Sequence, residues 1–416
     1  MMQNFCIGDQ ITILSKRSTF AGSPIQENDM LVAELRKKGK EIIRLNRGDP
    51  APYFRTPKYI TDAYISALRK GLTYYSSAAG LSELREAILK RHKRMFGLDA
   101  DMDSVIITQG VSEALQFINS AMIDEGDYAV LFKPYYPLYS LFLSFYGGRA
   151  IMESYYESMK WNIDTDRLEK VISAHKNKRI KYMLITNPNN PTGTVLDRKV
   201  LEDIVDIAND HDIFLVSDEI YDEIVFNNAK FTSIAEIADG IKYMILNGAS
   251  KDYDATGFRL GYAIVPGTDA DSMAVKRKFI ELAMSRLSVN TPAQYAFAEG
   301  LSNQREHSKA IKSMVKQIAE RANFVTKMIN ERDYMHAVEP NGAFYVFPRI
   351  DLKALHMKSD SDFVVSLLKE EGVQLTRGSG FGEGGYARIV ALPPKEVLRE
   401  AIEKIDRFAK RHSKEA

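Results

Sequence analysis

The sequence predicts an α/β fold with a large domain, whose mostly parallel mixed sheet is covered by helices, and a small α+β domain. The first reason is that short apolar runs rich in β-formers alternate with segments of helical period through the middle of the chain. The second is that the two ends of the chain lack this alternation. The third is that 416 residues, 45% hydrophobic and 27% charged, are typical of a globular chain that is long enough for more than one structural unit.

The middle of the chain contains the predicted sheet. Buried strands are expected at 105–108, 128–132, 182–186, 213–217, 243–247 and 260–265. Helices are expected at 111–123 and at 197–209, where Val200, Leu201, Ile204, Val205 and Ala208 share one face. Helices between successive strands favour parallel pairing, and ligands of such sheets bind beyond the carboxyl ends of the strands.

The two ends of the chain predict the small domain. Residues 28–45 read as a helix that leads into a strand at 42–45, and charged helical segments follow from about residue 305. A strand is expected at 342–347, and a final amphipathic helix carries Leu398, Ile402, Ile405 and Phe408 on one face. We therefore expect a large domain at 51–300 and a small domain built from 1–50 and 301–416.

Charge and cysteine content exclude several classes of protein. The net charge of +1 provides no basic field for nucleic acid or an anionic membrane. Cys6, the single cysteine, allows no internal disulfide and is expected to be inert, and the N-terminus lacks the pattern of a secretory signal. The apolar stretch 134–148 is shorter than the ~20 residues of a spanning helix. The seven histidines show no metal-ligand spacing. We expect a cytoplasmic protein without a metal.

Chemically informative residues follow the predicted strands. These are the run NPNNPTG at 187–193, SDEIY at 217–221, GASK at 248–251 with an arginine at 259, and the turn QGVSE at 109–113, which opens a helix. Together they place a lysine, an acid, a phenol, an amide, an arginine and a helix N-terminus at one rim of the sheet. This set suits a phosphorylated aromatic cofactor that forms an imine with lysine.

At this point the chain resembles a known family. The pattern S-K-x(5)-G-x-R-x-G at 250–261 is complete, and further blocks agree in order: YSSAAG (75–80), PYYP (134–137), NPNNPTG, NGAFY (341–345) and GSGFG (378–382) with an arginine at 388. The resemblance, from Arg44 to Pro394, is to the class I/II pyridoxal-phosphate-dependent aminotransferases of fold type I. It implies a fold type I large domain and small domain, and pyridoxal 5'-phosphate as the cofactor.

The resemblance implies roles around the cofactor ring. Lys251 would hold the cofactor as an imine and then shuttle a proton, which requires a pKa well below the ~10.4 of free lysine. Asp218 would face the pyridine nitrogen and keep the ring protonated. Tyr221 and Asn190 would hydrogen-bond the 3-oxygen, and Tyr136 would stack on the ring, with core packing as the alternative interpretation of Tyr136.

The resemblance also implies a phosphate site. The backbone N–H groups of Val111 and Ser112 at a helix N-terminus would bind the anion, with Ser250 adding a hydroxyl and Arg259 a fixed charge. Tyr75 would reach the phosphate of the neighbouring subunit, so the active unit would be a homodimer with shared active sites.

Substrate contacts are implied for two further positions and for Asn190. Arg388 would bind the substrate α-carboxylate, assisted by Asn190, and Gly48 is expected to line the substrate site; an ion pair with an acid is the alternative interpretation of Arg388. The distal carboxylate of 2-oxoglutarate needs a cation. The candidates are Arg17, Arg286 and Arg377, each with solvent exposure as the alternative.

One departure from the family pattern bears on the substrate. Many relatives have Ser or Thr three residues before the lysine, whereas this chain has Gly248. Together with NGASK, ATGFRLGY, NTPAQ and LNRGDPAP, this favours the alanine-aminotransferase branch. The predicted reaction moves the amino group of L-alanine to 2-oxoglutarate by a ping-pong mechanism and gives pyruvate and L-glutamate. The alternatives are an aspartate or broad-specificity aminotransferase, or a C–S β-lyase on the same fold.

Overall fold

A large mixed sheet forms the centre of the molecule. The computed structural model describes residues 17, 22–238 and 240–413. The sheet has the order β2-β9-β8-β7-β6-β3-β4-β5. Its strands are β2 (Val105–Thr108), β3 (Tyr128–Lys133), β4 (Arg149–Tyr156), β5 (Asn162–Ile163), β6 (Ile180–Thr186), β7 (Phe214–Asp218), β8 (Tyr243–Gly248) and β9 (Gly261–Ile264).

Most neighbouring strands in this sheet are parallel. Strand β3 pairs in parallel with β4 and β6, and the parallel pairing continues through β7 to β8. Strand β9 is antiparallel to both β8 and β2, and β5 is antiparallel to β4. Because β9 runs against its neighbours, its amino end lies at the rim where β7 and β8 have their carboxyl ends. Residues that precede β9 therefore meet residues that follow the other strands.

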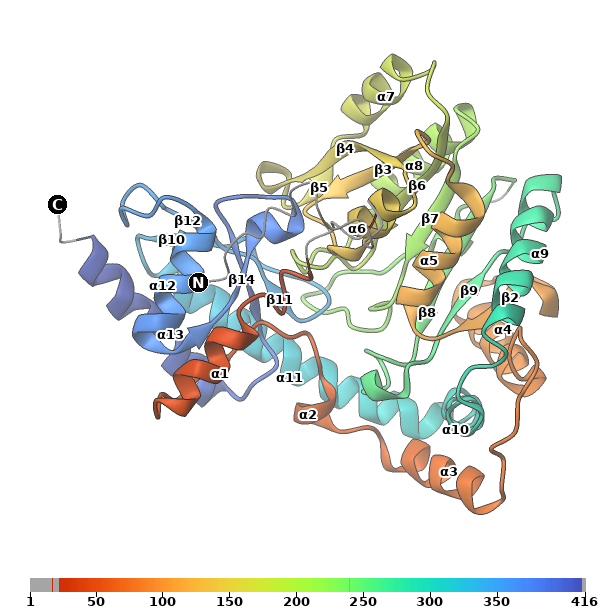
Figure 1. Ribbon diagram of the computed structural model, residues 1–416, viewed down its shortest axis with the longest axis horizontal. Coiled ribbons are helices and arrows are strands. Elements are labelled where there is room, and N and C mark those ends of the chain that lie inside the picture. The colour runs from red at the N-terminus through yellow and green to blue at the C-terminus, as the bar shows by residue number, and fades with distance from the viewer. Residues whose placement is uncertain (1–16, 18–21, 239, 414–416) are drawn as a thin grey trace, which may run out of the picture.

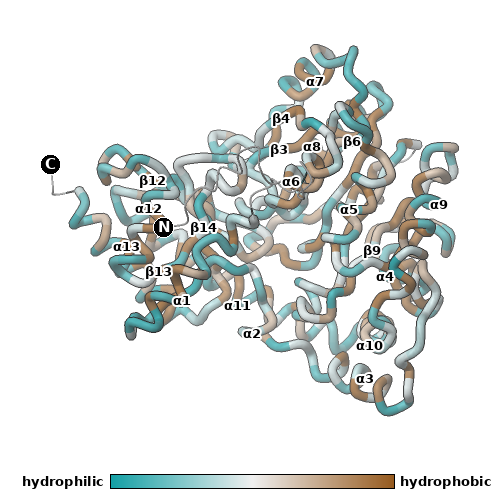
Figure 2. Tube along the Cα trace, viewed as in Figure 1, coloured by the Kyte–Doolittle hydropathy of each residue, from teal (hydrophilic) through white to brown (hydrophobic). Residues whose placement is uncertain are grey.

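Helices cover both faces of the sheet (Figure 1). They are α3 (Lys58–Arg69), α4 (Ser82–Phe96), α5 (Val111–Met122), α6 (Leu138–Phe145), α7 (Thr165–Ala174), α8 (Arg198–Asp210), α9 (Ala270–Ser285) and α10 (Thr291–Ser302). The residues of β2, β7, β8 and β9 are buried throughout, as expected for strands that are covered on both faces. Figure 2 shows hydrophobic segments, coloured brown, in the sheet and in the helices that cover it.

The remaining elements form a second packed region. They are α1 (Asp29–Lys37), β1 (Ile43–Arg44), α2 (Ala51–Phe54), α11 (Gln304–Asn330), β10 (Met335–His336), β11 (Tyr345–Val346), β12 (Arg349–Ile350), α12 (Asp360–Glu371), β13 (Val373–Gln374), β14 (Thr376–Arg377), β15 (Ala387–Val390) and α13 (Lys395–His412). Strand β1 pairs with β13, so residues near both ends of the chain lie side by side. Figure 1 shows α1, α12 and α13 on one side and the large sheet on the other, with α11 running between them.

This second region has its own hydrophobic core. This core contains Leu45 and side chains of α11, α12 and α13. It also contains Ile220, Tyr221 and Ile224 from the turn that follows β7. That turn thus connects the large sheet to the second core. The division into domains at residues 50 and 300 stays a prediction.

The predicted elements of the large sheet agree with the structure to within a few residues. The strand expected at 342–347 is shorter, Tyr345–Val346, because Ala343 has a positive φ of 50° that interrupts the extended backbone. Strand β4 was not expected, because its charged and polar side chains obscure the apolar pattern. Cys6 lies outside the described residues. No helix among the described residues is long and apolar enough to cross a membrane. The cytoplasmic location stays a prediction.

Candidate active site

A cavity of about 260 Å³ opens at the rim of the large sheet, beyond the carboxyl ends of β6, β7 and β8. It gathers most of the side chains that the sequence singles out, together with several that it does not. The lining residues are Ile25, Arg47, Gly48, Asp49, Val111, Ser112, Tyr136, Tyr139, Thr186, Asn190, Asp218, Ile220, Tyr221, Ser250, Lys251, Thr256, Arg259, Tyr345 and Arg388.

Lys251 lies on the turn after β8 with its amine directed into the cavity. Its Nζ donates a 2.6 Å hydrogen bond to the carbonyl oxygen of Gly48. Burial lowers the pKa of Lys251 from 10.5 to about 8, against the opposing effect of the nearby Asp49 carboxylate. About a tenth of this amine is therefore neutral at about pH 7, compared with less than about a thousandth for an ordinary lysine, and the neutral form is the nucleophile.

Asp218, the last residue of β7, is buried at the bottom of the cavity. Its Oδ2 accepts a 2.6 Å hydrogen bond from the Tyr139 hydroxyl, and its Oδ1 accepts one of 3.2 Å from the backbone N–H of Ile220. Burial raises the pKa of Asp218 from 3.8 to about 6, whereas both hydrogen bonds lower it. The Tyr139 hydroxyl also lies 2.9 Å from Thr186 Oγ1, so the tyrosine is fixed at both β6 and β7.

Arg388 of β15 is fully buried beside the cavity. Its Nη1 donates a 2.8 Å hydrogen bond to Asn190 Oδ1, and its Nη2 donates one of 2.5 Å to the carbonyl oxygen of Asn46. These partners are neutral, so the alternative of an ion pair with an acid does not apply. Its Nε is buried without a hydrogen-bond partner. Near it, the hydroxyl groups of Tyr221 and Tyr345 lie 2.8 Å apart.

A cradle for an anion lies at the N-terminus of α5. Gly110 precedes this helix with φ of 75°, and a Cβ there would lie 2.6 Å from Arg259 Nη2. A Cβ on Gly261 would lie 2.7 Å from the backbone nitrogen of Val111. Glycine at both positions therefore lets the helix N-terminus and the arginine approach each other. Backbone N–H groups and a guanidinium in this arrangement favour a bound phosphate.

The glycine three residues before Lys251 has a steric cause. A Cβ on Gly248 would lie 2.5 Å from the carbonyl oxygen of Leu260 and 2.7 Å from the Cα of Gly261. Gly248 and Gly261 are paired across β8 and β9, so the atoms that a Cβ on Gly248 would meet are backbone atoms of the sheet. A serine or threonine does not fit this backbone without a shift.

The chain matches a known family over most of its length. The match, over residues 40–405, is to the family described as aminotransferase class I and II. The chain belongs to this family. The resemblance to these aminotransferases, the α/β fold and the enzymatic class that it implied are thereby confirmed. The family uses pyridoxal phosphate.

Individual relatives extend the comparison. The chain is 34% identical, over 90% of its length and 92% of the relative, to the glutamate-pyruvate aminotransferase AlaA of Haemophilus influenzae. It is 30% identical, over 91% of its length and 94% of the relative, to the aspartate aminotransferase of Bacillus subtilis. The solved structure of the alanine aminotransferase from Pyrococcus furiosus superposes with a TM-score of 0.91 at 37% identity, covering 96% of this chain and 100% of that one.

Some residues that the sequence singles out in this aminotransferase do not line the cavity. Tyr75 is 78% exposed. Arg286 pairs with Glu113 at 3.0 Å and donates a 2.6 Å hydrogen bond to the carbonyl oxygen of Ile107, and thus ties α9 to the end of β2. Arg377 pairs with Glu27 at 2.8 Å. Arg17 is exposed, and none of the three arginines is among the described lining residues.

Sequence reasoning assigned no role to several cavity residues. Tyr139 lies in the run PYYPLY, which has three tyrosines, and the sequence alone does not show which of them lines a site. Tyr345 belongs to the block NGAFY, which the resemblance included without a role. Arg47 and Asp49 flank Gly48 and lie in the segment LNRGDPAP, which contributed to the choice of branch. The position of these two charged residues next to Gly48, a predicted substrate residue, could have indicated that they lie at the site.

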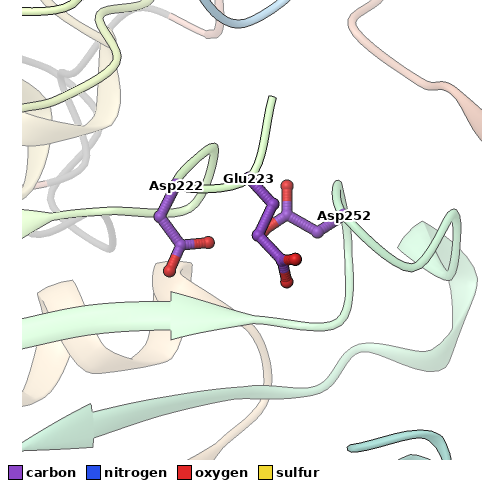
Figure 3. A group of neighbouring side chains, drawn as sticks. All are labelled: Asp222, Glu223 and Asp252. Atoms are coloured by element: carbon purple, nitrogen blue, oxygen red, sulfur yellow. The ribbon is translucent and has the colours of Figure 1, made fainter. Parts of the chain in front are cut away.

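Three acids lie side by side behind the lysine. Figure 3 shows the side chains of Asp222, Glu223 and Asp252, whose carboxylate oxygens lie within 4.8 Å of one another. Asp222 and Glu223 lie on the turn after β7, and Asp252 follows Lys251 in the chain. Arg91 of α4 lies between two of them, with nitrogens 2.9 Å from oxygens of Asp222 and of Glu223. Burial, together with the neighbouring Asp222 carboxylate, raises the pKa of Asp252. The group has the geometry of a metal site, but Arg91 already forms salt bridges with two of its three carboxylates. The absence of a metal stays a prediction.

Proposed function

We propose that this aminotransferase transfers the amino group of L-alanine to 2-oxoglutarate, giving pyruvate and L-glutamate, with pyridoxal 5'-phosphate held at Lys251. One observation carries the proposal: a lysine of lowered pKa shares a cavity with Arg388, a buried arginine that has no acidic partner among its hydrogen bonds. The first group suits an imine with the cofactor and the second suits a substrate carboxylate. The names of the relatives from H. influenzae and P. furiosus support the substrate pair.

The residues of the cavity fit this cofactor. The cradle of Val111, Ser112, Ser250 and Arg259 offers donors and positive charge for the phosphate. At the other end Asp218 offers a carboxylate, which a protonated ring nitrogen requires. Lys251 lines the same cavity, and its amine would hold the cofactor as an imine. When bound, pyridoxal phosphate supplies an electron sink for the pair of electrons that the substrate Cα–H bond leaves behind.

The side chains of this enzyme would orient the substrate and move its protons. Arg388 would bind the α-carboxylate through the donors that now face Asn190, Asn46 and the buried side of the cavity. The Nζ of Lys251 would take up and release the Cα proton of the substrate, a role that its pKa of about 8 suits near neutral pH. Tyr221 and Asn190 would hydrogen-bond the ring oxygen, and Tyr136 would pack against the ring.

We also propose that the enzyme acts as a homodimer with shared active sites. Tyr75 is expected to reach the phosphate of the partner subunit, and its 78% exposure supports a contact outside its own subunit.

The test is the visible absorbance of the purified protein. A band of lysine-bound pyridoxal phosphate that L-alanine bleaches and 2-oxoglutarate restores would support the cofactor, the substrate pair and the ping-pong order together. A band that L-aspartate bleaches and L-alanine does not would favour the aspartate alternative, to which the B. subtilis relative points. Release of pyruvate and ammonia from a cysteine conjugate, without an oxoacid, would favour the C–S lyase. Lys251→Ala is the control, because full turnover by that variant would contradict the mechanism.

A further inference from the structure

Arg47 is the cation at the cavity to which the proposed function gives no task. Among the described lining residues, the other cations are Lys251, Arg259 and Arg388, which are proposed to bind the cofactor and the α-carboxylate. Arg47 is 49% exposed at the side chain, so it lies at the solvent-facing edge of the cavity. We propose that Arg47 binds the distal carboxylate of 2-oxoglutarate and glutamate. This inference rests on the proposed function.

The backbone around Arg47 places it close to both fixed ends of a substrate. The carbonyl oxygen of Asn46 accepts the hydrogen bond from Arg388, and the carbonyl oxygen of Gly48 accepts the one from Lys251. Arg47 therefore lies on the segment that contacts the α-carboxylate site and the amine site at once. A substrate anchored at these two sites presents its third substituent, the side chain, near this segment.

Arg47 now pairs with Asp29 of α1, and Asp29 is able to release it. The same carboxylate accepts a 2.6 Å hydrogen bond from Arg44 Nη2 and one of 3.2 Å from Gln374 Nε2. Arg44 and Gln374 are themselves joined by a 2.9 Å hydrogen bond. If a substrate carboxylate takes the place of Asp29 on Arg47, Asp29 keeps a cationic partner, and no charge is left uncompensated.

This exchange explains how one site accepts two unlike side chains. The methyl group of alanine needs no partner, so the pair of Arg47 and Asp29 stays closed over it. A second carboxylate, by contrast, meets the Asp49 carboxylate in the same cavity and needs a cation of its own. Asp49 accepts a 2.8 Å hydrogen bond from Thr256 Oγ1, which holds its negative charge at the cavity. Arg47 meets this need without a residue from elsewhere in the chain.

The test compares Arg47→Met with Arg44→Met in the cofactor-loaded enzyme. Both variants remove one arginine from the same acid, but only Arg47 lines the cavity. For Arg47→Met we expect the rate of the glutamate half-reaction, divided by that of the alanine half-reaction, to fall about 10- to 100-fold. This is the effect expected from the loss of one charge-assisted hydrogen bond. For Arg44→Met we expect the ratio to change less than about 3-fold. Arg47→Lys, which keeps the charge, should give an intermediate ratio.

A binding measurement separates this inference from the proposed function. Calorimetric titration with glutarate reports the distal carboxylate, and pentanoate is the control of equal length without it. Arg47→Met should weaken glutarate by about the same factor as the rate ratio and weaken pentanoate much less. Equal losses for both acids, or an equal effect of Arg44→Met, would overturn the role of Arg47. If the wild-type enzyme converted neither amino acid, the proposed function would fail, and the glutarate titration would still decide the role of Arg47.

Discussion

Tyr139→Phe tests whether a buried phenol keeps Asp218 ionised. The Tyr139 hydroxyl donates a 2.6 Å hydrogen bond to Asp218, whose pKa burial has already raised to about 6. A hydrogen bond to a charged group contributes about 1.5–3 kcal/mol, and about 1.4 kcal/mol corresponds to one pKa unit. Loss of the hydroxyl therefore raises the pKa of Asp218 to between about 7 and 8.

The consequence is a loss of charge in the range where the enzyme works. At about pH 7 the ionised fraction of Asp218 falls from roughly nine tenths in the wild-type protein to between about a half and a tenth in the variant. Because the ionised carboxylate is the form that pairs with a protonated ring nitrogen, we expect the Kd for pyridoxal phosphate to rise about 2- to 10-fold at this pH. At about pH 9 both proteins have an ionised Asp218, so the difference in Kd should nearly vanish.

The assay is fluorescence or absorbance titration of the cofactor-free protein at both pH values. Tyr155→Phe is the matched control, because Tyr155 is equally buried and its hydroxyl bonds to Thr186 at 3.3 Å instead of to Asp218. An increase in Kd that is the same at about pH 7 and about pH 9 would refute the reasoning, since it would mean that Tyr139 does not act through the ionisation of Asp218.

Three further predictions follow from the same structure. Capture of pyridoxal phosphate by the cofactor-free protein should speed up as the pH rises through about 8, because only neutral Lys251 reacts. Asp49→Asn removes a negative charge that stabilises the ammonium form of Lys251, so it should lower the pH midpoint of the capture rate. An unchanged midpoint in stopped-flow traces would contradict this effect of Asp49. Gly248→Ser should lower the free energy of unfolding by about 1–3 kcal/mol, because its Cβ meets the sheet backbone, and a tighter phosphate site in a cofactor titration would count against this. Arg91→Met should lower the free energy of unfolding by about 3–5 kcal/mol in urea titrations, because it leaves Asp222 without its buried cation; a loss under about 1 kcal/mol would be inconsistent with this.

The sheet could be predicted from the sequence because its strands are short, apolar and separated by helices. Strands β2, β7, β8 and β9 are buried on both faces, and burial on both faces produces continuous apolar runs. Strand β4 has exposed Arg149 and Met152 among its buried residues, so its period is mixed. The second core could not be predicted in detail, because it joins Leu45 to residues hundreds of positions away, and such pairing leaves no local pattern.

The residues of the candidate site could be predicted where a motif includes them. Lys251, Asp218 and Arg388 follow from blocks with fixed spacing, and the structure brings them to one cavity. Tyr139 acts through its contact with Asp218, a partner 79 residues away, and a sequence pattern does not contain that contact. Arg47 has an acid partner in α1, and only its position at the cavity distinguishes it from an ordinary surface arginine.

The cavity takes its lining residues from nearly the whole chain, from Ile25 to Arg388, and this has a thermodynamic consequence. No partly folded chain contains the complete site, so a ligand of this site binds the folded state alone. Such a ligand adds about 2.7 kcal/mol of stability when its concentration is 100 times its Kd. The supply of the cofactor should therefore govern how long this protein survives proteolysis, through mass action on the whole fold.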